Sequence, residues 1–374
     1  MAAKDLVVFY ATNRLRMSDA FDATSAEAPD NRRLWLGKAA VEMLGDPALT
    51  EAPRHLLAHP EIPGDDDFKD PAAGAAAKLL DAWLDDAAAR GAVALFFIHG
   101  FANGFNSALE RAAQITEFFR DQVTLAPFAF SWPSDGRVID AEEMLLPFSG
   151  AIEQYRIDQA DAIGAGGALS RLLREIHRAR VRAEARGRRP RMVLLAHSMG
   201  NLALAGGLAV MRNGLLTAGM KGTFDHAVLV AADVPDTALE PQEPLSEIAL
   251  LATEVTVVIS RDRTLRTASF IANGKSRRLG HFGPAALARL PGHVTVVDYF
   301  LGLQDPRSKP QLFAVGGTEW DIVEHQYYRN DIKAREDLAV VLRGGVPAGR
   351  VVLDPAHQVE DGRARHQMLP FTGV

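Results

Sequence analysis

The sequence contains no cysteine among its 374 residues. This absence excludes disulfide bonds, thiol catalysis and cysteine-ligated metal sites. It also contains no apolar run long enough to span a bilayer, and the apolar run at its N-terminus is too short for a signal peptide before the polar Thr12-Asn13-Arg14. We therefore expect a cytoplasmic protein with no stable membrane insertion.

An excess of positive charge is also missing, since the formal net charge at pH 7 is −6. A protein that grips phosphate backbones usually carries such an excess. The arginine-rich stretch 171–191 is interleaved with Glu175 and Glu184, and cations suit the C-terminal end of a helix, so this stretch predicts a solvated helix end. We expect no nucleic-acid partner. The 48% of hydrophobic residues is near the average for globular proteins and allows a sizeable core.

Strand-like and helix-like segments alternate along most of the chain. The expected strands are 6–10, 34–43, 93–98, 128–132, 191–196, 227–232, 255–260 and 294–298. The expected helices are 75–89, 107–120, 151–185 with an interruption at 164–167, and 331–342. This alternation predicts an α/β fold, with a mostly parallel central sheet, helices on both faces and extra N-terminal strands.

The same segments suggest the domain organisation. We expect a single domain over residues 1–343, in which 1–74 form an N-terminal strand extension and 75–343 the catalytic core. Residues 344–374 are rich in Gly, Pro, Arg and Asp, and we expect them to form a C-terminal tail with a strand at most.

One short motif carries the strongest chemical signal. Ala196-His197-Ser198-Met199-Gly200 has the form of a nucleophile elbow, in which a buried strand turns sharply into a helix and a serine occupies the strained corner. The first small residue is alanine rather than the usual glycine. An apolar run precedes the motif, and a helical apolar spacing follows it up to Asn213-Gly214. Ser198 is therefore the candidate nucleophile.

A serine nucleophile needs a histidine base and a carboxylate that orients the base, and here the expected chain order is serine, acid, histidine. Asp262 directly follows the strand 255–260 and is the preferred acid, with Asp233, at the end of the preceding strand, as the alternative. His325 stands just before the last expected helix and is the preferred base. His281, which lies in a loop, is the alternative base.

Acyl transfer also needs hydrogen-bond donors for the developing oxyanion. The backbone N–H of Met199, directly after the nucleophile, is the first expected donor. The second should come from the loop His99-Gly100-Phe101-Ala102, where we prefer the N–H of Phe101 and keep that of Ala102 as the alternative. His99 is expected to brace this loop rather than to titrate.

The substrate pocket should be bordered by the loops that follow the strands. The residues expected to line it are His99, Gly100, Ala102, His197 and Trp132. For Trp132, packing in the core is an equal alternative. Leu145-Leu146-Pro147-Phe148 could form a small mobile cap.

Several of these motifs together resemble a known family. They are Phe9-Tyr10-Ala11-Thr12-Asn13-Arg14, His99-Gly100-Phe101, Ser131-Trp132-Pro133-Ser134, Ala196-His197-Ser198-Met199-Gly200-Asn201 and His325-Gln326-Tyr327-Tyr328. The resemblance is to the α/β-hydrolase superfamily, and more narrowly to a bacterial branch usually labelled alpha/beta hydrolase of unknown function. It covers about Phe9 to Leu342. It implies the α/β-hydrolase fold with an eight-stranded type of sheet, serine ester hydrolysis and no cofactor.

The residues and the resemblance together predict a serine hydrolase that cleaves carboxylic esters through an acyl-enzyme intermediate. We expect a small-molecule ester as substrate, no cofactor and no metal, and we predict no particular oligomeric state. An acyltransferase, a thioesterase or an amidase would use the same triad. A non-catalytic binding scaffold of the same fold is the alternative from a different class.

Overall fold

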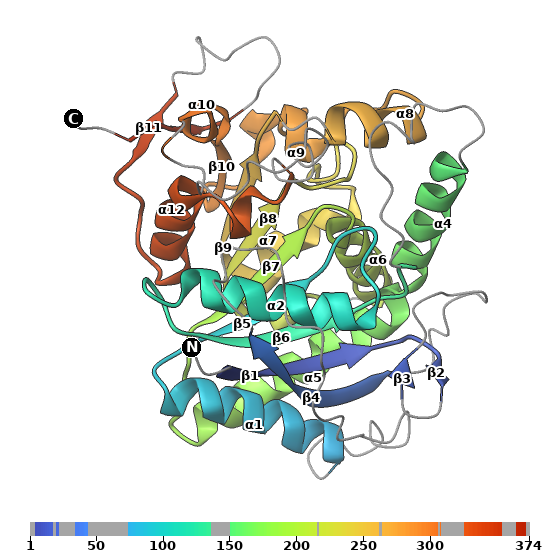
Figure 1. Cartoon of the computed structure of the whole chain (residues 1–374), viewed down its shortest axis with the longest axis vertical. Helices are drawn as coiled ribbons and strands as arrows, with labels where there is room; N and C mark the ends of the chain where they lie inside the picture. The colour runs from blue at the N-terminus through green and yellow to red at the C-terminus, as the bar shows by residue number, and fades with distance from the viewer. Residues whose placement is uncertain are drawn as a thin grey trace.

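A central sheet with helices on both faces forms the body of the molecule (Figure 1). The computed structural model of the chain describes residues 4–17, 20–21, 34–43, 74–135, 150–214, 217–261, 264–305, 307, 325–353 and 364–371. The segment expected to form a cap, Leu145–Phe148, lies outside these residues, as does Asp262.

The sheet has ten strands within the described residues. In spatial order they are β11 (Arg350–Val352), β12 (His366–Met368), β10 (Val294–Asp298), β9 (Ala252–Ile259), β8 (Phe224–Val230), β7 (Met192–His197), β5 (Val93–Ile98), β6 (Leu125–Ser131), β1 (Lys4–Thr12) and β4 (Trp35–Met43). All neighbours from β12 to β1 are parallel, and the edge strands β4 and β11 are antiparallel to theirs. Two short strands, β2 (Arg16–Met17) and β3 (Ala20–Phe21), pair separately. The expected mostly parallel α/β sheet is confirmed.

The helices divide between the two faces of the sheet. They are α1 (Ala75–Ala89), α2 (Phe105–Phe119), α4 (Ala151–Gly164), α5 (Gly166–Ala185), α6 (Gly200–Asn213), α7 (Ile248–Leu251), α8 (Phe270–Ala272), α9 (Leu279–Phe282), α10 (Phe300–Gln304) and α12 (Ile332–Leu342). A π-helix, η4 (Leu265–Ser269), and the 3₁₀ helices η2 (Thr217–Met220), η3 (Pro244–Glu247), η5 (Leu287–Arg289) and η7 (Tyr327–Arg329) complete the set. One core packs α1, α5 and α6 on the sheet, and the other packs α2 and α12. None of the helices in the described ranges is long and apolar enough to cross a membrane.

The central strand β5 is apolar at every position because both of its faces are covered. In β5, alternate side chains enter opposite cores, as the two-residue period of a strand requires. One core receives Ala94, Phe96 and Ile98. The other receives Val93, Leu95 and Phe97.

The two ends of the chain extend the sheet. The expected N-terminal strand pair is β1 with β4, and it joins the main sheet where β1 pairs with β6. At the other end, residues 344–374 contribute two short strands where we expected one strand at most. The pairing of β12 with β10 is accompanied by burial of Met368, which packs so closely on Gly302 that a Cβ there would lie 2.3 Å from the methionine methyl carbon.

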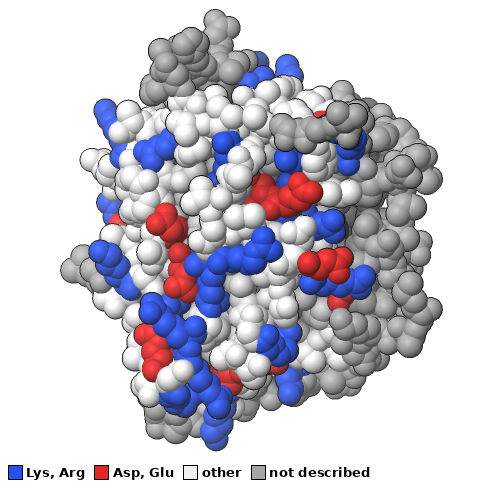
Figure 2. Space-filling view, turned by 90° about the vertical axis from the view of Figure 1, so that its left-hand side faces the viewer, with Lys and Arg blue, Asp and Glu red and all other residues white. Residues whose placement is uncertain are grey.

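The arginine-rich end of α5 is docked on α1 by ion pairs. Arg182 pairs with Asp81 at 3.0 Å, and both Arg186 and Arg188 pair with Asp85 at 3.1 and 2.8 Å. Figure 2 shows basic and acidic side chains standing next to one another on this side of the molecule. The stretch is therefore a surface helix end, as expected, and Arg182, Arg186 and Arg188 form ion pairs with acidic residues of α1.

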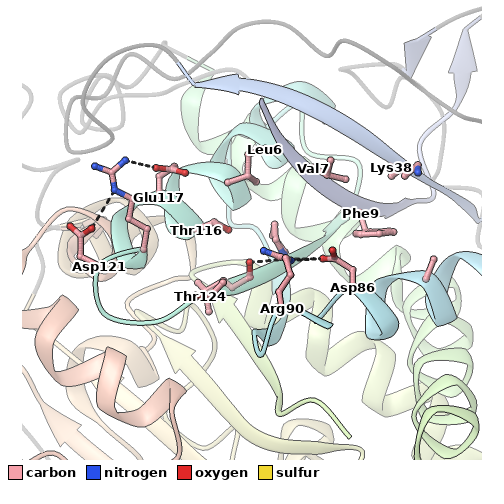
Figure 3. A pocket seen from close by; sticks show the side chains of 14 residues that line it. Leu6, Val7, Phe9, Lys38, Asp86, Arg90, Thr116, Glu117, Asp121 and Thr124 are labelled. Atoms are coloured by element: carbon pink, nitrogen blue, oxygen red, sulfur yellow. Dashed lines mark hydrogen bonds and ion pairs between the residues drawn. The ribbon is translucent and has the colours of Figure 1, made fainter. Parts of the chain in front are cut away.

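A hollow of about 740 Å³ opens where β1 and β6 separate (Figure 3). β1 pairs with β6 along residues 9–12, so the first carbonyl groups of β6 have no strand partner on that side. The Trp83 indole donates to the Ala126 carbonyl oxygen at 2.9 Å, and Arg90 donates to that of Leu125 at 3.3 Å. Of these two carbonyl groups, that of Leu125 faces the open side, because the preceding carbonyl, of Thr124, accepts from Val93 of β5 and carbonyl directions alternate along a strand. The hollow lies at the end of the sheet where the parallel strands begin.

Candidate active site

Ser198 occupies a sharp corner between β7, which ends at His197, and α6, which begins at Gly200. Its φ of 53° lies in the left-handed region, which residues other than glycine rarely adopt. The Ser198 N–H donates to the Val230 carbonyl oxygen at 3.0 Å, and the Ser198 carbonyl oxygen accepts from the N–H of Asp233 at 3.1 Å. Such a conformation persists only where neighbouring structure holds it, and here the end of β8 does so.

Two glycines allow the elbow to approach the loop after β5. A Cβ at Gly200 would lie 2.5 Å from the His99 carbonyl oxygen, and a Cβ at Gly100 would lie 2.9 Å from the Ser198 Cβ. Both contacts are too short for any side chain, so the two backbones interlock. Ala196 stands where the motif usually has glycine, but it lies inside the extended strand β7, where its methyl group is buried.

The structure brings His325 to the nucleophile. Its Nε2 lies 2.8 Å from the Ser198 Oγ, and both residues are buried, with 7% and 5% of their surface exposed. A serine hydroxyl that donates to Nε2 requires this nitrogen to be unprotonated, which is the state in which it can take the serine proton. The other candidate base, His281, lies in α9 with its ring against Phe282.

His197, which we expected to line the pocket, supports His325 instead. Its Nε2 lies 3.0 Å from the backbone carbonyl oxygen of His325, and a carbonyl only accepts, so Nε2–H is the donor. Its ring also packs on that of Tyr328, with centroids 4.5 Å apart. Burial and the neighbouring His325 lower the pKa of His197 well below its usual value, so the ring is neutral at pH 7.

The alternative acid, Asp233, is fully buried at the end of β8, and both of its carboxylate oxygens are occupied. Oδ1 accepts from Arg278 Nε at 2.8 Å and from the Ser269 hydroxyl, and Oδ2 accepts from the Tyr155 hydroxyl. Its hydrogen bonds therefore lead to α4, η4 and Arg278. The preferred acid, Asp262, directly follows Arg261 at the end of β9 and lies outside the described residues.

The loop after β5 has its peptide groups held from one side. The Gly100 carbonyl oxygen accepts from His99 Nδ1 at 2.8 Å and from Asn103 Nδ2 at 3.1 Å. The Phe101 carbonyl oxygen accepts from the same amide at 2.8 Å. In a trans peptide the N–H points away from the preceding carbonyl, so these bonds turn the N–H groups of Phe101 and Ala102 away from Asn103. Ala102 completes the bend with a φ of 58°.

His99 braces this loop as a neutral ring. Burial lowers the pKa of His99 to about 3, and its Nδ1–H donates to Gly100. Trp132 is fully buried, stacks on the imidazole with centroids 5.0 Å apart and donates from Nε1 to the His99 carbonyl oxygen at 2.8 Å. Trp132 is therefore packed in the core, which was the alternative to lining the pocket. Its indole contacts the site by holding His99 in the loop after β5.

A buried arginine joins the loops after β5 and β6. The guanidinium of Arg14 donates to the carbonyl oxygens of Asn103, Trp132 and Ser134 at 2.7, 2.6 and 2.9 Å. Sequence reasoning included Arg14 in the family resemblance but assigned it no role. Its position directly after the first strand was the available signal, because that strand ends at the same edge of the sheet as β7.

Asp158 of α4 is a buried residue that supports the loops after β5 and β6. Its carboxylate accepts from the Ser134 hydroxyl at 2.5 Å, and the Ser134 oxygen in turn accepts from the Asn103 N–H at 3.2 Å. Asp158 is fully buried, and this burial raises its pKa to about 6.

Within the described parts of the chain, no three His, Asp or Glu side chains form a group that could hold a metal ion. The described residues offer a serine hydroxyl, an imidazole and backbone N–H groups at the site.

The comparison with known families agrees with this architecture. A family model described as an alpha/beta hydrolase of unknown function (DUF900) matches residues 76–299, which include the loop after β5, the elbow and the end of β9. The chain belongs to this alpha/beta hydrolase family. Neither a curated protein nor a solved structure matches the chain.

The interlocked glycines lead to a first prediction. Gly200→Ala should lower the free energy of unfolding by about 1–3 kcal/mol, because the new methyl group meets rigid backbone of the loop after β5. Urea denaturation measures the change. Gly219→Ala, where a Cβ would meet nothing within 4 Å, is the matched control and should change stability by less than about 0.5 kcal/mol. Equal stability of the two variants would contradict the interlocking.

The raised pKa of Asp158 predicts that the stability of the fold depends on pH. The folded-state pKa of about 6 exceeds the usual 3.8, so the folded state binds more protons between these values, and stability falls as the pH rises through this window. Asp158→Asn removes a carboxylate that is ionised and buried above pH 6. It should therefore raise the free energy of unfolding by about 1–3 kcal/mol at pH 8 and by clearly less at pH 5. This range follows because each unit of pKa shift corresponds to about 1.4 kcal/mol. An equal gain at both pH values would contradict the assignment.

Proposed function

We propose that the protein is a serine hydrolase that cleaves small-molecule carboxylic esters through an acyl-enzyme intermediate on Ser198. The observation that carries this proposal is the hydrogen bond of 2.8 Å between the Ser198 Oγ and His325 Nε2 at a strained strand-to-helix corner. Membership of the alpha/beta hydrolase family supports hydrolysis as the reaction class. Esters are preferred because an alkoxide leaves more easily than an amine.

In the proposed mechanism, Ser198 attacks the ester carbonyl while His325 takes its proton. The negative charge that develops on the carbonyl oxygen is stabilised by the N–H groups of Met199 and Phe101. Met199 immediately precedes α6, so its N–H is among those that lack an acceptor within the helix, and the positive end of the helix dipole favours the oxyanion. His325 then protonates the leaving alcohol, and a water molecule repeats the sequence to release the acid.

We propose Asp262 as the acid that orients His325. It follows β9 in the chain, and β9 lies two strands from β7 in the sheet, with β8 between them. The rival Asp233 has three side-chain donors from other elements, which argues for a different role.

Covalent labelling tests the proposed function. A fluorophosphonate probe should label the wild-type protein, and Ser198→Ala should abolish labelling because no other hydroxyl lies against an imidazole of this kind in the described site. His325→Ala should retain the serine but lower ester turnover by about 10⁴-fold or more. Ser246→Ala, a serine outside the site, is the control and should label fully. A folded wild-type protein that neither labels nor hydrolyses p-nitrophenyl esters of short or long acyl groups would refute the proposal.

The two aspartates can be compared in the same assay. Asp262→Asn should lower kcat by about 10³–10⁴-fold, because the imidazole loses its orienting partner and the stabilisation of its charged form. Asp233→Asn should lower kcat by less, since the residue lies outside the proton-transfer path. The measurement is kcat per labelled site for each variant. A greater loss in Asp233→Asn than in Asp262→Asn would make Asp233 the acid.

A further inference from the structure

Asp233 gathers three separate segments of the chain around one buried carboxylate. Its side chain is fully buried and accepts from the hydroxyls of Tyr155 in α4 and Ser269 in η4, and from the guanidinium of Arg278. Arg278 also donates to the Asp233 backbone carbonyl oxygen at 2.8 Å and is itself 3% exposed. A buried carboxylate with donors on both oxygens orients the groups that bind it.

The same residue is bonded directly to the elbow. The Asp233 N–H donates to the Ser198 carbonyl oxygen at 3.1 Å, one residue before the proposed oxyanion donor Met199. The backbone position of Asp233 therefore helps to hold one side of the proposed oxyanion hole.

The side chain of Asp233 leads to the other side of that hole through Tyr155. The Tyr155 ring packs on the ring of Phe101, with centroids 5.1 Å apart and a tilt of 45°. Phe101 stands between Gly100 and Ala102, so of these three residues only Phe101 has a large side chain that can pack on a neighbouring element. Tyr155 is 4% exposed and thus has little freedom once its hydroxyl is bound.

The helix that carries Tyr155 has further bonds to the same region. Gln159 donates to the Asn273 side chain at 2.8 Å, directly after α8, and Arg156 reaches the Ala272 carbonyl oxygen at 3.4 Å. α4 and α8 lie side by side at the upper right of Figure 1. Asp233 is thus the buried centre of a unit made of α4, η4 and α8. This unit reaches the oxyanion loop through the ring contact of Tyr155 with Phe101, and α4 also reaches the loop separately through Asp158 and Ser134.

We propose that Asp233 is a positioning residue that aligns the two sides of the oxyanion hole, at the elbow through its backbone and at Phe101 through Tyr155. This inference rests on the proposed serine-hydrolase function. It assigns Asp233 to the stabilisation of the oxyanion and leaves proton transfer to the acid that orients His325.

Substitutions of Tyr155 separate the hydrogen bond from the aromatic contact. Tyr155→Phe keeps the ring against Phe101 but removes the bond to Asp233, and it should lower kcat by about 10-fold. Tyr155→Leu also removes the ring contact and should lower kcat by about 100-fold, near the loss seen when one oxyanion donor is removed. KM should change by less than about 3-fold in both, because the interaction strengthens only in the transition state.

A second buried cluster, which also joins a tyrosine and an arginine to an aspartate, provides the control. The Tyr299 hydroxyl donates to Asp337, which also binds Arg350 at 2.6 Å, so Tyr299→Phe makes the same chemical change away from Phe101. All variants are counted by end-point labelling with a fluorophosphonate, so that kcat is given per active site. Tyr299→Phe should lower the melting temperature without lowering kcat per site. If Tyr155→Phe behaves in the same way, Asp233 has a structural role alone and the proposal is wrong.

Two further measurements distinguish the role of Asp233 from that of an acid. Affinity for a trifluoromethyl ketone, which forms a tetrahedral adduct on the serine, should fall in parallel with kcat in the Tyr155 variants. The pH midpoint of kcat/KM should be the same in wild type, Tyr155→Phe and Asp233→Asn. A shifted midpoint with a loss above about 10³-fold in Asp233→Asn would make it the triad acid and overturn the proposal. A wild-type protein that does not label would refute the proposed function, and this inference with it, before any variant is compared.

Discussion

The strained corner at Ser198 is the constraint on which the site depends. A serine at a φ of 53° is costly, and it is held because Val230 of β8 and Asp233, three residues further on, bond the peptide groups on both sides of it. Gly100 and Gly200 also allow the loop after β5 to press against it. The parallel sheet makes this possible, since β5, β7 and β8 are neighbours and all end at the same edge. Strand order thus determines which loops can meet above the serine.

The loops around the corner are organised by donors that bind carbonyl oxygens. Asn103 and the neutral His99 hold the Gly100 carbonyl, and Arg14 holds those of three residues in two loops. Each bond to a carbonyl turns the following N–H in the opposite direction. Buried side chains that bind these carbonyl oxygens can therefore set the direction of the backbone N–H groups that follow them.

The central strands and the corner at Ser198 could be predicted from local sequence patterns. The hydrogen bonds that organise the loops could not, because they join residues far apart in the chain. The apolar runs predicted the central strands, and the Ala196–Gly200 motif predicted the corner, because both signals lie within a few consecutive residues. The bonds of Arg14 span about 90 to 120 positions, and the Tyr155–Asp233 bond spans 78, so no local pattern contains them. The strands β11 and β12 have three residues each, which is too short for a period of two to be recognised.

Chain order alone leaves two aspartates after neighbouring strands as rivals for one role, and their partners distinguish them physically. A triad acid must keep an oxygen for the imidazole, while a carboxylate that orders several segments uses both oxygens for donors fixed in those segments. Asp233 has the second arrangement, with Arg278, Ser269 and Tyr155 around it. The desolvation of its charge is compensated within this cluster, and what the cluster provides in return is a fixed position for α4 and, through Tyr155, for Phe101. Under the two proposals, the same residue type orients the base after one strand and aligns the oxyanion hole after its neighbour.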